Sequence, residues 1–312
     1  MRYRRIESSQ GAARKPVVMS SVFSYEQAFS RSVGWITQSE QSTLRHSRIA
    51  IAGLGGVGGA HLMTLARLGI GRFHLSDFDV FDLPNMNRQA GAHMKTLGRA
   101  KIDVLGEMAR EINPDIELGL FPNGVNTANI DPFLSGIDVY VDGLDFFAFD
   151  ARALVFEEAR RRGIPAVTVA PLGMGAALLN FLPDGMSFES YFRWQGCSEL
   201  EKALRFMLGL APQGLHRGYL VDRSAVDLAG RRGPSTPMAC ELCAGIAATE
   251  TLKLLLKRGK VWAAPYGMQF DAFQNKMVRT WRPGGNANPL QRIALAIARR
   301  QFADLVPAKE HA

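Results

Sequence analysis

A glycine-rich turn is the first feature of the chain whose residue types point to a particular chemistry. It reads Gly-Leu-Gly-Gly-Val-Gly at residues 53–58 and follows a short apolar segment at residues 47–53. Glycines allow a backbone with positive φ and let phosphate groups approach closely. A helix that starts after the turn would point its amide groups and its positive dipole end at the anion. The turn therefore predicts a nucleotide-binding site that includes Gly53, Gly55, Gly56 and Gly58.

Asp77 strengthens this prediction because it ends the next apolar segment, at residues 72–78. Dinucleotide-binding folds place an acidic residue at this position, where it accepts a hydrogen bond from a ribose hydroxyl. The turn and the aspartate together predict nucleotide binding, but they do not distinguish NAD from ATP.

A polar stretch beyond Asp77 favours ATP. It contains Asp79, Asn85, Arg88 and Gln89, and Lys101 follows it. Arg88 and Lys101 are cations that can neutralise the β- and γ-phosphates, with the side-chain amides as neutral donors beside them. A dehydrogenase has no need of such a group.

Asp145 is the candidate magnesium ligand. It follows a further apolar segment at residues 137–142, and doubly wound folds gather their ligands at the carboxyl ends of such strands. A carboxylate there can hold Mg²⁺ together with phosphate oxygens.

The segments that must position these residues alternate between strand and helix patterns. This alternation predicts an α/β fold with a Rossmann-like, doubly wound and mainly parallel sheet. After residue 183 the chain becomes rich in turns, which predicts an excursion that returns to the domain through an apolar helix at 240–257 and a closing strand pair within 266–281. The expected strands lie at 47–53, 72–78, 116–121, 137–142 and 165–170, and the expected helices at 60–68, 97–112, 148–162, 199–210 and 288–300.

The expected domain organisation has three parts. Residues 1–20 form a basic, flexible tail, and residues 21–282 form the nucleotide-binding domain, within which 183–237 is the excursion. Residues 283–312 form a basic helix and a tail.

The composition agrees with a basic globular enzyme. The chain has 312 residues and a formal net charge of +8, a balance that favours polyanionic partners such as nucleotides, RNA or an acidic protein. Three cysteines are too few for a secreted disulfide framework. No signal peptide is apparent, and the most apolar stretch, at 166–182, is interrupted by proline and glycine. We therefore expect a cytoplasmic protein without a membrane span.

Taken together, the motifs resemble the ThiF/MoeB/HesA family, relatives of the ubiquitin-activating enzymes, over roughly residues 24–282. The resemblance implies that Gly53–Gly58 is the family's glycine motif and Asp77 its ribose aspartate. It further implies a phosphate clamp, a lysine in a Gly-x-x-Lys context, a magnesium-side aspartate, and an arginine that reaches the partner subunit's nucleotide in a homodimer. In this chain the matching residues are Asn85, Arg88 and Gln89 for the clamp, then Lys101, Asp145 and Arg31.

The implied reaction is attack by a carboxylate on the α-phosphate of Mg-ATP, which gives an acyl adenylate and pyrophosphate. The resemblance implies that the carboxylate is the C-terminus of a ubiquitin-like or sulfur-carrier protein, or of a peptide. Three alternatives remain open: an ATP-dependent tRNA-modifying dehydratase of the same family, a NAD-dependent oxidoreductase, and an inactive nucleotide-binding partner module.

The cysteines and one aromatic residue depart from the family's pattern. Many relatives hold zinc with two C-x-x-C pairs, whereas this chain has one pair, Cys240 and Cys243, and the isolated Cys197. Four thiolates cannot be assembled in one chain, so zinc is not expected. Cys197 lies in the excursion, where some relatives carry a thioester-forming cysteine, and is a candidate nucleophile. Phe146 stands where relatives often have asparagine, which bears on the identity of the substrate.

Overall fold

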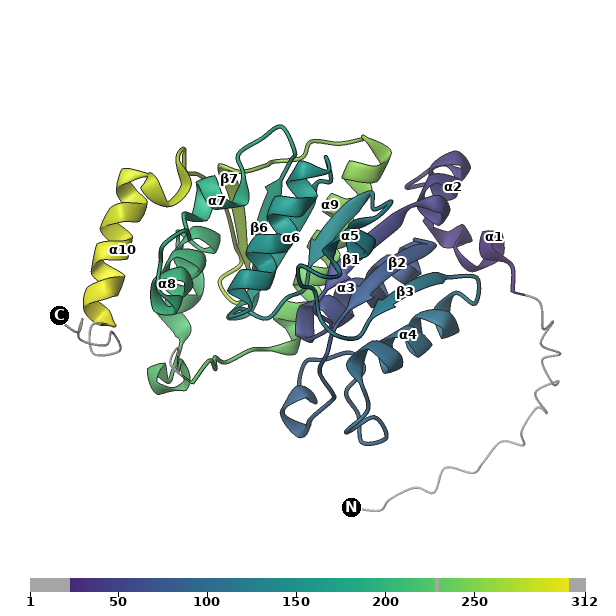
Figure 1. Cartoon of the computed structure of the whole chain (residues 1–312), viewed down its shortest axis with the longest axis horizontal. Helices are drawn as coiled ribbons and strands as arrows, with labels where there is room; N and C mark the ends of the chain where they lie inside the picture. The colour runs from purple at the N-terminus through teal and green to yellow at the C-terminus, as the bar shows by residue number, and fades with distance from the viewer. Residues whose placement is uncertain (1–22, 228–229, 303–312) are drawn as a thin grey trace, which may run out of the picture.

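The computed structural model describes residues 23–227 and 230–302. The predicted tail at 1–20 lies outside these residues. The described chain forms one eight-stranded sheet in the order β3-β2-β1-β4-β5-β6-β7-β8 (Figure 1). The strands are β1 (Arg48–Ala52), β2 (Arg72–Ser76), β3 (Glu117–Phe121), β4 (Val139–Asp142), β5 (Ala166–Leu172), β6 (Gly175–Phe181), β7 (Tyr266–Asp271) and β8 (Lys276–Trp281).

Helices and short 3-10 turns connect the strands. The α-helices are α1 (Tyr25–Ala28), α2 (Gln38–His46), α3 (Gly56–Leu68), α4 (Lys101–Ile112), α5 (Ile130–Leu134), α6 (Phe149–Arg161), α7 (Phe188–Phe192), α8 (Glu199–Leu210), α9 (Pro237–Leu256) and α10 (Pro289–Gln301). The 3-10 turns are η1 (Ser30–Ser32), η2 (Leu83–Asn85), η3 (Leu215–Tyr219), η4 (Arg223–Ala225) and η5 (Gly285–Ala287).

The first five strands of the chain run parallel, which confirms the predicted doubly wound sheet. Ala52 at the end of β1 pairs with Ser76 on β2 and with Asp142 on β4. This register brings the carboxyl ends of the three strands to the same level. The residues that follow them meet where the strand order reverses, and open α/β sheets bind their ligands in this crevice.

The other end of the sheet is antiparallel. β5 and β6 form a hairpin, and β7 and β8 extend it. β6 was not predicted, because residues 166–182 read as one interrupted apolar stretch. The turn between β5 and β6 contains Gly173, whose φ of +62° is one that glycine adopts without strain.

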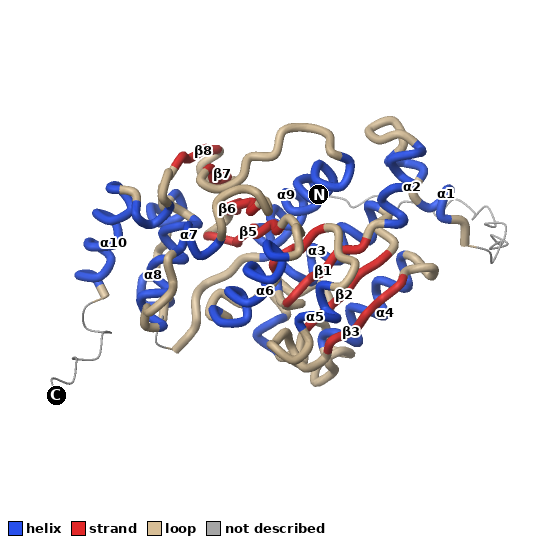
Figure 2. Tube along the Cα trace, turned by 45° about the horizontal axis from the view of Figure 1, so that its top comes forward, coloured by secondary structure: helices blue, strands red, loops and turns tan. Residues whose placement is uncertain are grey.

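Two helical layers cover the sheet (Figure 2). α3, α4 and α9 pack against one face together with α2, and α5, α6, α7 and α8 pack against the other. The central strands β1, β4 and β5 contribute buried side chains to both layers. The site residues are therefore attached to strands that are buried on both faces.

Two helices begin at different residues from those predicted. α3 starts at Gly56 rather than at residue 60, so the glycine turn itself opens the helix. α4 starts at Lys101 rather than at residue 97, because Gly98 has a φ of +78° and the chain is not helical before Ala100.

The predicted excursion is present between β6 and α9, and contains α7, α8, η3 and η4. α10 packs on α8 through a small apolar cluster of Leu204, Leu208, Leu295 and Ala298. Neither α10 nor any other helix in residues 23–227 and 230–302 has the length and apolar character that crossing a membrane requires.

Candidate nucleotide-binding site

The glycine turn is held in place by contacts between backbone atoms. Gly53 has a φ of +82°, and a Cβ atom on Gly58 would lie 1.8 Å from the carbonyl oxygen of Gly53. A Cβ atom on Gly143, which follows β4, would lie 2.3 Å from the same oxygen. Only glycine fits at these positions, because a neighbouring backbone cannot move aside as a flexible side chain can.

The start of α3 lacks a side-chain cap. Gly55 is the N-cap residue and offers no side chain to the amide groups of the first turn. A Cβ atom on Gly55 would have its nearest neighbour, Nε2 of Gln89, 4.0 Å away, so there is open space in front of the helix. Free amide groups and the positive end of the helix dipole favour an anion at this place.

Asp77 fixes the shape of the turn from the end of β2. One carboxylate oxygen accepts a hydrogen bond of 2.6 Å from the amide of Leu54, and the other accepts one of 2.8 Å from the amide of Asp79. Burial raises the pKa of Asp77, while these two amides and the charge of Lys101 act in the opposite direction. The ribose role of Asp77 stays a prediction, and the structure adds that this carboxylate positions the glycine turn.

Lys101 lies at the first position of α4. Its ammonium group is 2.9 Å from a carboxylate oxygen of Asp79, and its amide donates to the carbonyl of Asp79. The lysine side chain is 7% exposed and the aspartate side chain 53% exposed. The ion pair therefore ties Lys101 to the segment that leads away from Asp77.

Arg88 lies directly against the start of α3. Its Cγ atom would be 3.4 Å from a Cβ atom placed on Gly56. Its guanidinium donates to the carbonyl of Pro84 at 3.0 Å and to the side-chain oxygen of Asn87 at 2.9 Å. Across residues 23–227 and 230–302, no carboxylate forms an ion pair with Arg88. A positive charge that is not neutralised thus accompanies the uncapped helix start.

The two amide residues of the predicted clamp differ in their contacts. Gln89 is buried, and its side-chain oxygen has no hydrogen-bond partner in the described part of the chain. Asn85 instead accepts a 3.0 Å hydrogen bond from the amide of Asp82 and so caps η2. The structure gives Asn85 a part in shaping the clamp segment, and its predicted contact with the nucleotide stays a prediction.

Asp145 is exposed in the loop after β4. One of its carboxylate oxygens accepts a 2.9 Å hydrogen bond from the amide of Phe147. The described residues contain no group of three or more His, Cys, Asp or Glu side chains that could hold a metal ion. A single carboxylate still fits Mg²⁺, because this ion usually keeps several waters and is held by one or two carboxylates together with substrate phosphates.

A buried ion pair that the sequence analysis missed supports the Asp145 loop. Asp142 and Arg152 are 2.9 Å apart, and both side chains are 2% exposed. Arg152 also donates to the carbonyl oxygens of Leu144, Asp145 and Phe146. The available signal was an aspartate that ends an apolar strand, followed by an arginine on the predicted helix at 148–162.

The cysteine pair is packed next to the turn. The sulfur of Cys240 would be 2.9 Å from a Cβ atom on Gly56. Burial raises the pKa of Cys240, opposed by a hydrogen bond with Ser235 and by the charge of Arg88. Burial also raises the pKa of Cys243 well above the ordinary thiol value. Both thiols are therefore protonated at neutral pH, as packing residues would be.

Two predicted site residues have no contact with the turn. Cys197 lies between α7 and α8; its thiol donates to the carbonyl of Arg193, and burial raises its pKa. Arg31 is exposed on η1 and makes no hydrogen bond or ion pair within the described residues. The thioester role of Cys197 and the action of Arg31 in trans stay predictions.

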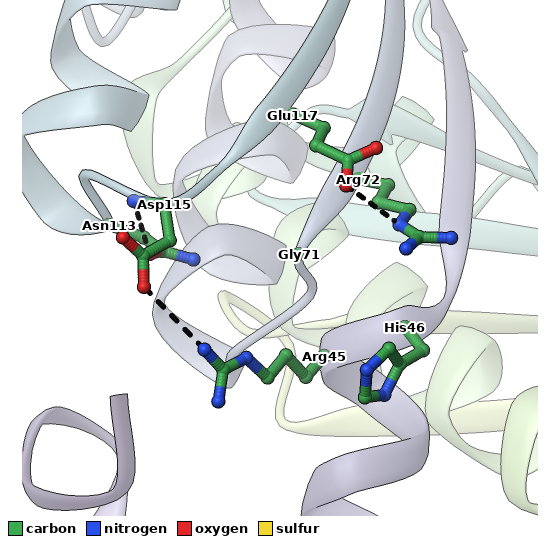
Figure 3. Close-up of a pocket in the computed structure, with 7 residues that line it drawn as sticks. All are labelled: Arg45, His46, Gly71, Arg72, Asn113, Asp115 and Glu117. Carbon is green, nitrogen blue, oxygen red and sulfur yellow. Dashed lines mark hydrogen bonds and ion pairs between the residues drawn. The ribbon is translucent and has the colours of Figure 1, made fainter. Parts of the chain in front are cut away.

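A separate cavity of about 190 Å³ lies where β2 and β3 begin, at the ends of the strands opposite to the glycine turn (Figure 3). Its arginines are matched by carboxylates: Arg45 is 3.6 Å from Asp115, and Arg72 is 3.3 Å from Glu117. Because its charges are already neutralised, this cavity is a poorer candidate for a nucleotide than the glycine turn.

Comparison with known proteins decides the family. The ThiF family matches residues 29–292, which is most of the chain. The chain belongs to the ThiF family. This assignment confirms the resemblance stated from the glycine motif and the residues after Asp77.

Two sequence relatives differ in what they act on. This ThiF-family chain is 31% identical to the tRNA threonylcarbamoyladenosine dehydratase of Haemophilus influenzae over 50% of its own length and 59% of that protein. It is 28% identical to the SAMP-activating enzyme E1 of Haloferax volcanii over 70% of its own length and 71% of that protein. The chain thus spans less than two thirds of the dehydratase.

A solved structure shows the same fold. The tRNA N6-threonylcarbamoyladenosine dehydratase of Escherichia coli, crystallised with ATP, superposes with a TM-score of 0.55 at 21% identity. The match covers 74% of this chain and 95% of that one.

Proposed function

We propose that this chain binds ATP at the glycine turn and activates a carboxylate as its acyl adenylate, with release of pyrophosphate. The observation that carries the proposal is the uncapped start of α3 with the guanidinium of Arg88 beside it. The E. coli relative that was crystallised with ATP supports the choice of nucleotide. A NAD-dependent oxidoreductase would leave Arg88, Lys101 and Asp145 without a task.

The proposed roles follow from the positions of the residues. The first-turn amides of α3 bind a phosphate, and Arg88 and Lys101 stabilise the charge that develops on the departing pyrophosphate. Mg²⁺, when bound, screens the phosphate charges, and Asp145 supplies one oxygen to it. Arg152 positions Asp145 through the carbonyl oxygens of the same loop.

ATP–pyrophosphate exchange with purified protein, Mg²⁺ and fractionated host extract tests the proposal. We expect exchange that depends on a fraction of the extract, and a loss of about 100-fold or more in Arg88→Ala, because such charges act mainly on the transition state. Arg110→Ala is the matched control, since Arg110 is exposed on α4 and makes no ion pair in the described structure.

The outcome also tests the alternative of an inactive module. Mg-ATP binding without exchange in any fraction would overturn the proposal in favour of a nucleotide-binding partner module. A loss below about threefold in Arg88→Ala, with exchange in the wild type, would remove Arg88 from the proposed machinery.

The carboxylate that we propose first is the C-terminus of a ubiquitin-like or sulfur-carrier protein, or of a peptide. The Haloferax relative, named as a SAMP-activating enzyme, supports it. A carboxylate carried by a tRNA base is the second candidate, supported by the Haemophilus relative and by the net charge of +8. Activity that depends on a protease-sensitive fraction would favour the first candidate, and activity that depends on an RNase-sensitive fraction the second.

The proposal includes a homodimer in which Arg31 reaches the partner's nucleotide. A dimer in light scattering, and complementation between Arg31→Ala and Arg88→Ala subunits in mixed dimers, would support it. A monomer that remains active would remove the role of Arg31 in trans.

A further inference from the structure

The antiparallel edge of the sheet carries a group of aromatic and basic side chains. We call this group the β8 face; it consists of Lys260, Trp262, Tyr266, Arg279 and Trp281. Tyr266 on β7 pairs with Trp281 on β8, and Trp281 is 57% exposed. Figure 2 shows β7 and β8 at the end of the sheet farthest from β3.

The side chains of the β8 face contact one another in a series. The ammonium group of Lys260 lies 4.0 Å, and the guanidinium carbon of Arg279 4.1 Å, from the centre of the Trp262 ring. The ring centres of Trp262 and Tyr266 are 4.9 Å apart. Tyr266 and Trp281 are stacked, with an interplanar angle of 29° and ring centres 6.3 Å apart. The series thus runs from two cations that the Trp262 ring holds in place at one end to the exposed indole of Trp281 at the other.

Most of the positive charge of residues 257–282 is not neutralised by the described residues; only Arg258 forms an ion pair, with Glu40 at 3.1 Å. In the described residues, no carboxylate forms an ion pair with Lys260, Lys276, Arg279 or Arg282. Residues 257–282 contain six lysines and arginines but a single acidic residue, Asp271. The carboxylate of Asp271 accepts a hydrogen bond of 2.7 Å from Tyr219. The β8 face therefore combines exposed aromatic surface with a local excess of positive charge.

We propose that the β8 face binds a single-stranded stretch of RNA, with one base stacked on Trp281 and phosphates beside Lys260 and Arg279. Proteins recognise unpaired RNA by stacking its bases on aromatic rings, and cations beside the rings follow the backbone. An acidic protein segment would be attracted by the cations but would make no use of the indole stack. Charge complementarity and the exposed ring together favour RNA.

The β8 face and the glycine turn lie at opposite ends of the strands. β7 runs antiparallel to β6, and β6 runs antiparallel to β5. Tyr266 at the start of β7 therefore lies level with the start of β5. The glycine turn follows the carboxyl end of β1, which is the other end of the parallel strands. The inference rests on the proposed function in one respect: it deepens the second candidate substrate, a carboxylate carried by RNA. It can be tested separately, because binding at the β8 face needs no ATP.

Fluorescence anisotropy of a short, labelled single-stranded RNA with the full-length protein, without ATP, tests the inference. We expect Trp281→Ala to weaken binding roughly tenfold, the usual effect of losing one stacked base. Trp281→Phe keeps an aromatic face and should recover most of the affinity. Arg279→Gln and Lys260→Gln should each weaken binding and reduce the slope of log affinity against log salt by about 0.7, the contribution of one phosphate contact on a single strand.

Two variants elsewhere serve as matched controls. Trp35 is 86% exposed between η1 and α2 and is not part of the β8 face, although its carbonyl accepts a hydrogen bond from Arg258; Arg110 is exposed on α4. Trp35→Ala and Arg110→Gln should bind RNA as the wild type does. A Trp281→Ala variant that binds like Trp35→Ala would overturn the inference.

Two further outcomes would also overturn it. Equal affinity for a duplex of the same sequence would mean that phosphates alone are bound. Displacement of the RNA by polyglutamate, with the same dependence on Trp281, would assign the surface to an acidic protein. Exchange activity is measured separately, so a failure of RNA binding at the β8 face and a failure of adenylation are distinguishable.

Discussion

The parallel half of the sheet, from β3 to β5, and the antiparallel half, from β6 to β8, differ in what surrounds their strands. In the parallel half, backbone packs against backbone at Gly53, Gly58 and Gly143, and a buried ion pair supports the loop beyond β4. In the antiparallel half, β8 is an edge strand, and the side chains of Met277 and Trp281 are 69% and 57% exposed.

This difference separates two tasks. The proposed nucleotide site depends on backbone positions that tolerate no added atom, which requires a closely fixed backbone around the glycine turn. In the antiparallel half, the edge strand β8 offers exposed side chains that can change without disturbing the core, which suits the recognition of a substrate. Equivalent substitutions in the two halves should therefore lower the free energy of unfolding by unequal amounts.

The largest effect is expected from breaking the buried ion pair of the parallel half. Asp142 also accepts hydrogen bonds from Thr168 and Tyr140. Asp142→Ala leaves the guanidinium of Arg152 buried without a counter-charge, and breaking such a pair typically costs about 3–5 kcal/mol. Urea unfolding followed by circular dichroism measures this loss in the free energy of unfolding.

The matched substitution removes an exposed ion pair beyond the antiparallel half. Arg299 on α10 pairs with Glu201, and its side chain is 48% exposed. Arg299→Ala should cost less than about 1 kcal/mol, because solvent screens the half-exposed arginine and because Glu201, which is 18% exposed, keeps its ion pair with Arg205. Equal losses in the two variants would break the comparison between the halves.

A smaller effect is expected from adding one methyl group to a glycine in each half. Gly58→Ala brings Cβ to 1.8 Å from a backbone oxygen, and we expect a loss of about 3 kcal/mol, at the upper end for overpacking. Gly267→Ala on β7 brings Cβ to 3.1 Å from a methyl group of the buried Leu179 and 3.2 Å from the hydroxyl of Thr280, so two side chains must shift by a few tenths of an ångström and the loss should be smaller, about 1 kcal/mol. Thermal unfolding of both variants provides the test, and a Gly58→Ala protein as stable as Gly267→Ala would contradict the proposed rigidity.

The sequence predicted the parallel half well because its signals are local. A glycine turn between an apolar segment and a helix, and acidic residues at strand ends, follow directly from the demands of phosphate binding and of parallel strands. The prediction missed β6, because a strand buried on both faces has no polar alternation to mark its limits.

The contacts that complete the site could not be predicted, because they join residues that are distant in the sequence. Cys240 packs on Gly56, and Asn87 donates to the carbonyl of Ser235. Asn85 also shows the limit of motif reading: its side-chain oxygen caps η2, a contact that the motif does not indicate, while its contact with a nucleotide stays a prediction. Which of several polar atoms faces the ligand depends on the local backbone, and residue type does not reveal it.

The smallest expected effect is on the pH dependence of stability, and it concerns two histidines, one in each half. His61 on α3 is fully buried, neither ring nitrogen has a hydrogen-bond partner in the described structure, and burial lowers its pKa to about 4, opposed weakly by Asp142. The unfolded chain takes up a proton near pH 6.5, whereas the folded chain does so only near pH 4, so stability falls as the pH drops between these values. We expect a loss of about 2 kcal/mol between pH 7.5 and pH 5 from this residue.

Urea unfolding of His61→Leu at both pH values measures this contribution, since the decline in stability between them should be about 2 kcal/mol smaller in the variant than in the wild type. His216 on η3 is partly exposed, and burial lowers its pKa as well. His216→Leu should therefore remove a smaller share of the pH dependence. A histidine stays neutral in the folded state when its surroundings shield it from water. If His216→Leu removed the larger share of the pH dependence, the surroundings of His216 would be the more tightly packed ones, and the comparison between the halves would be contradicted.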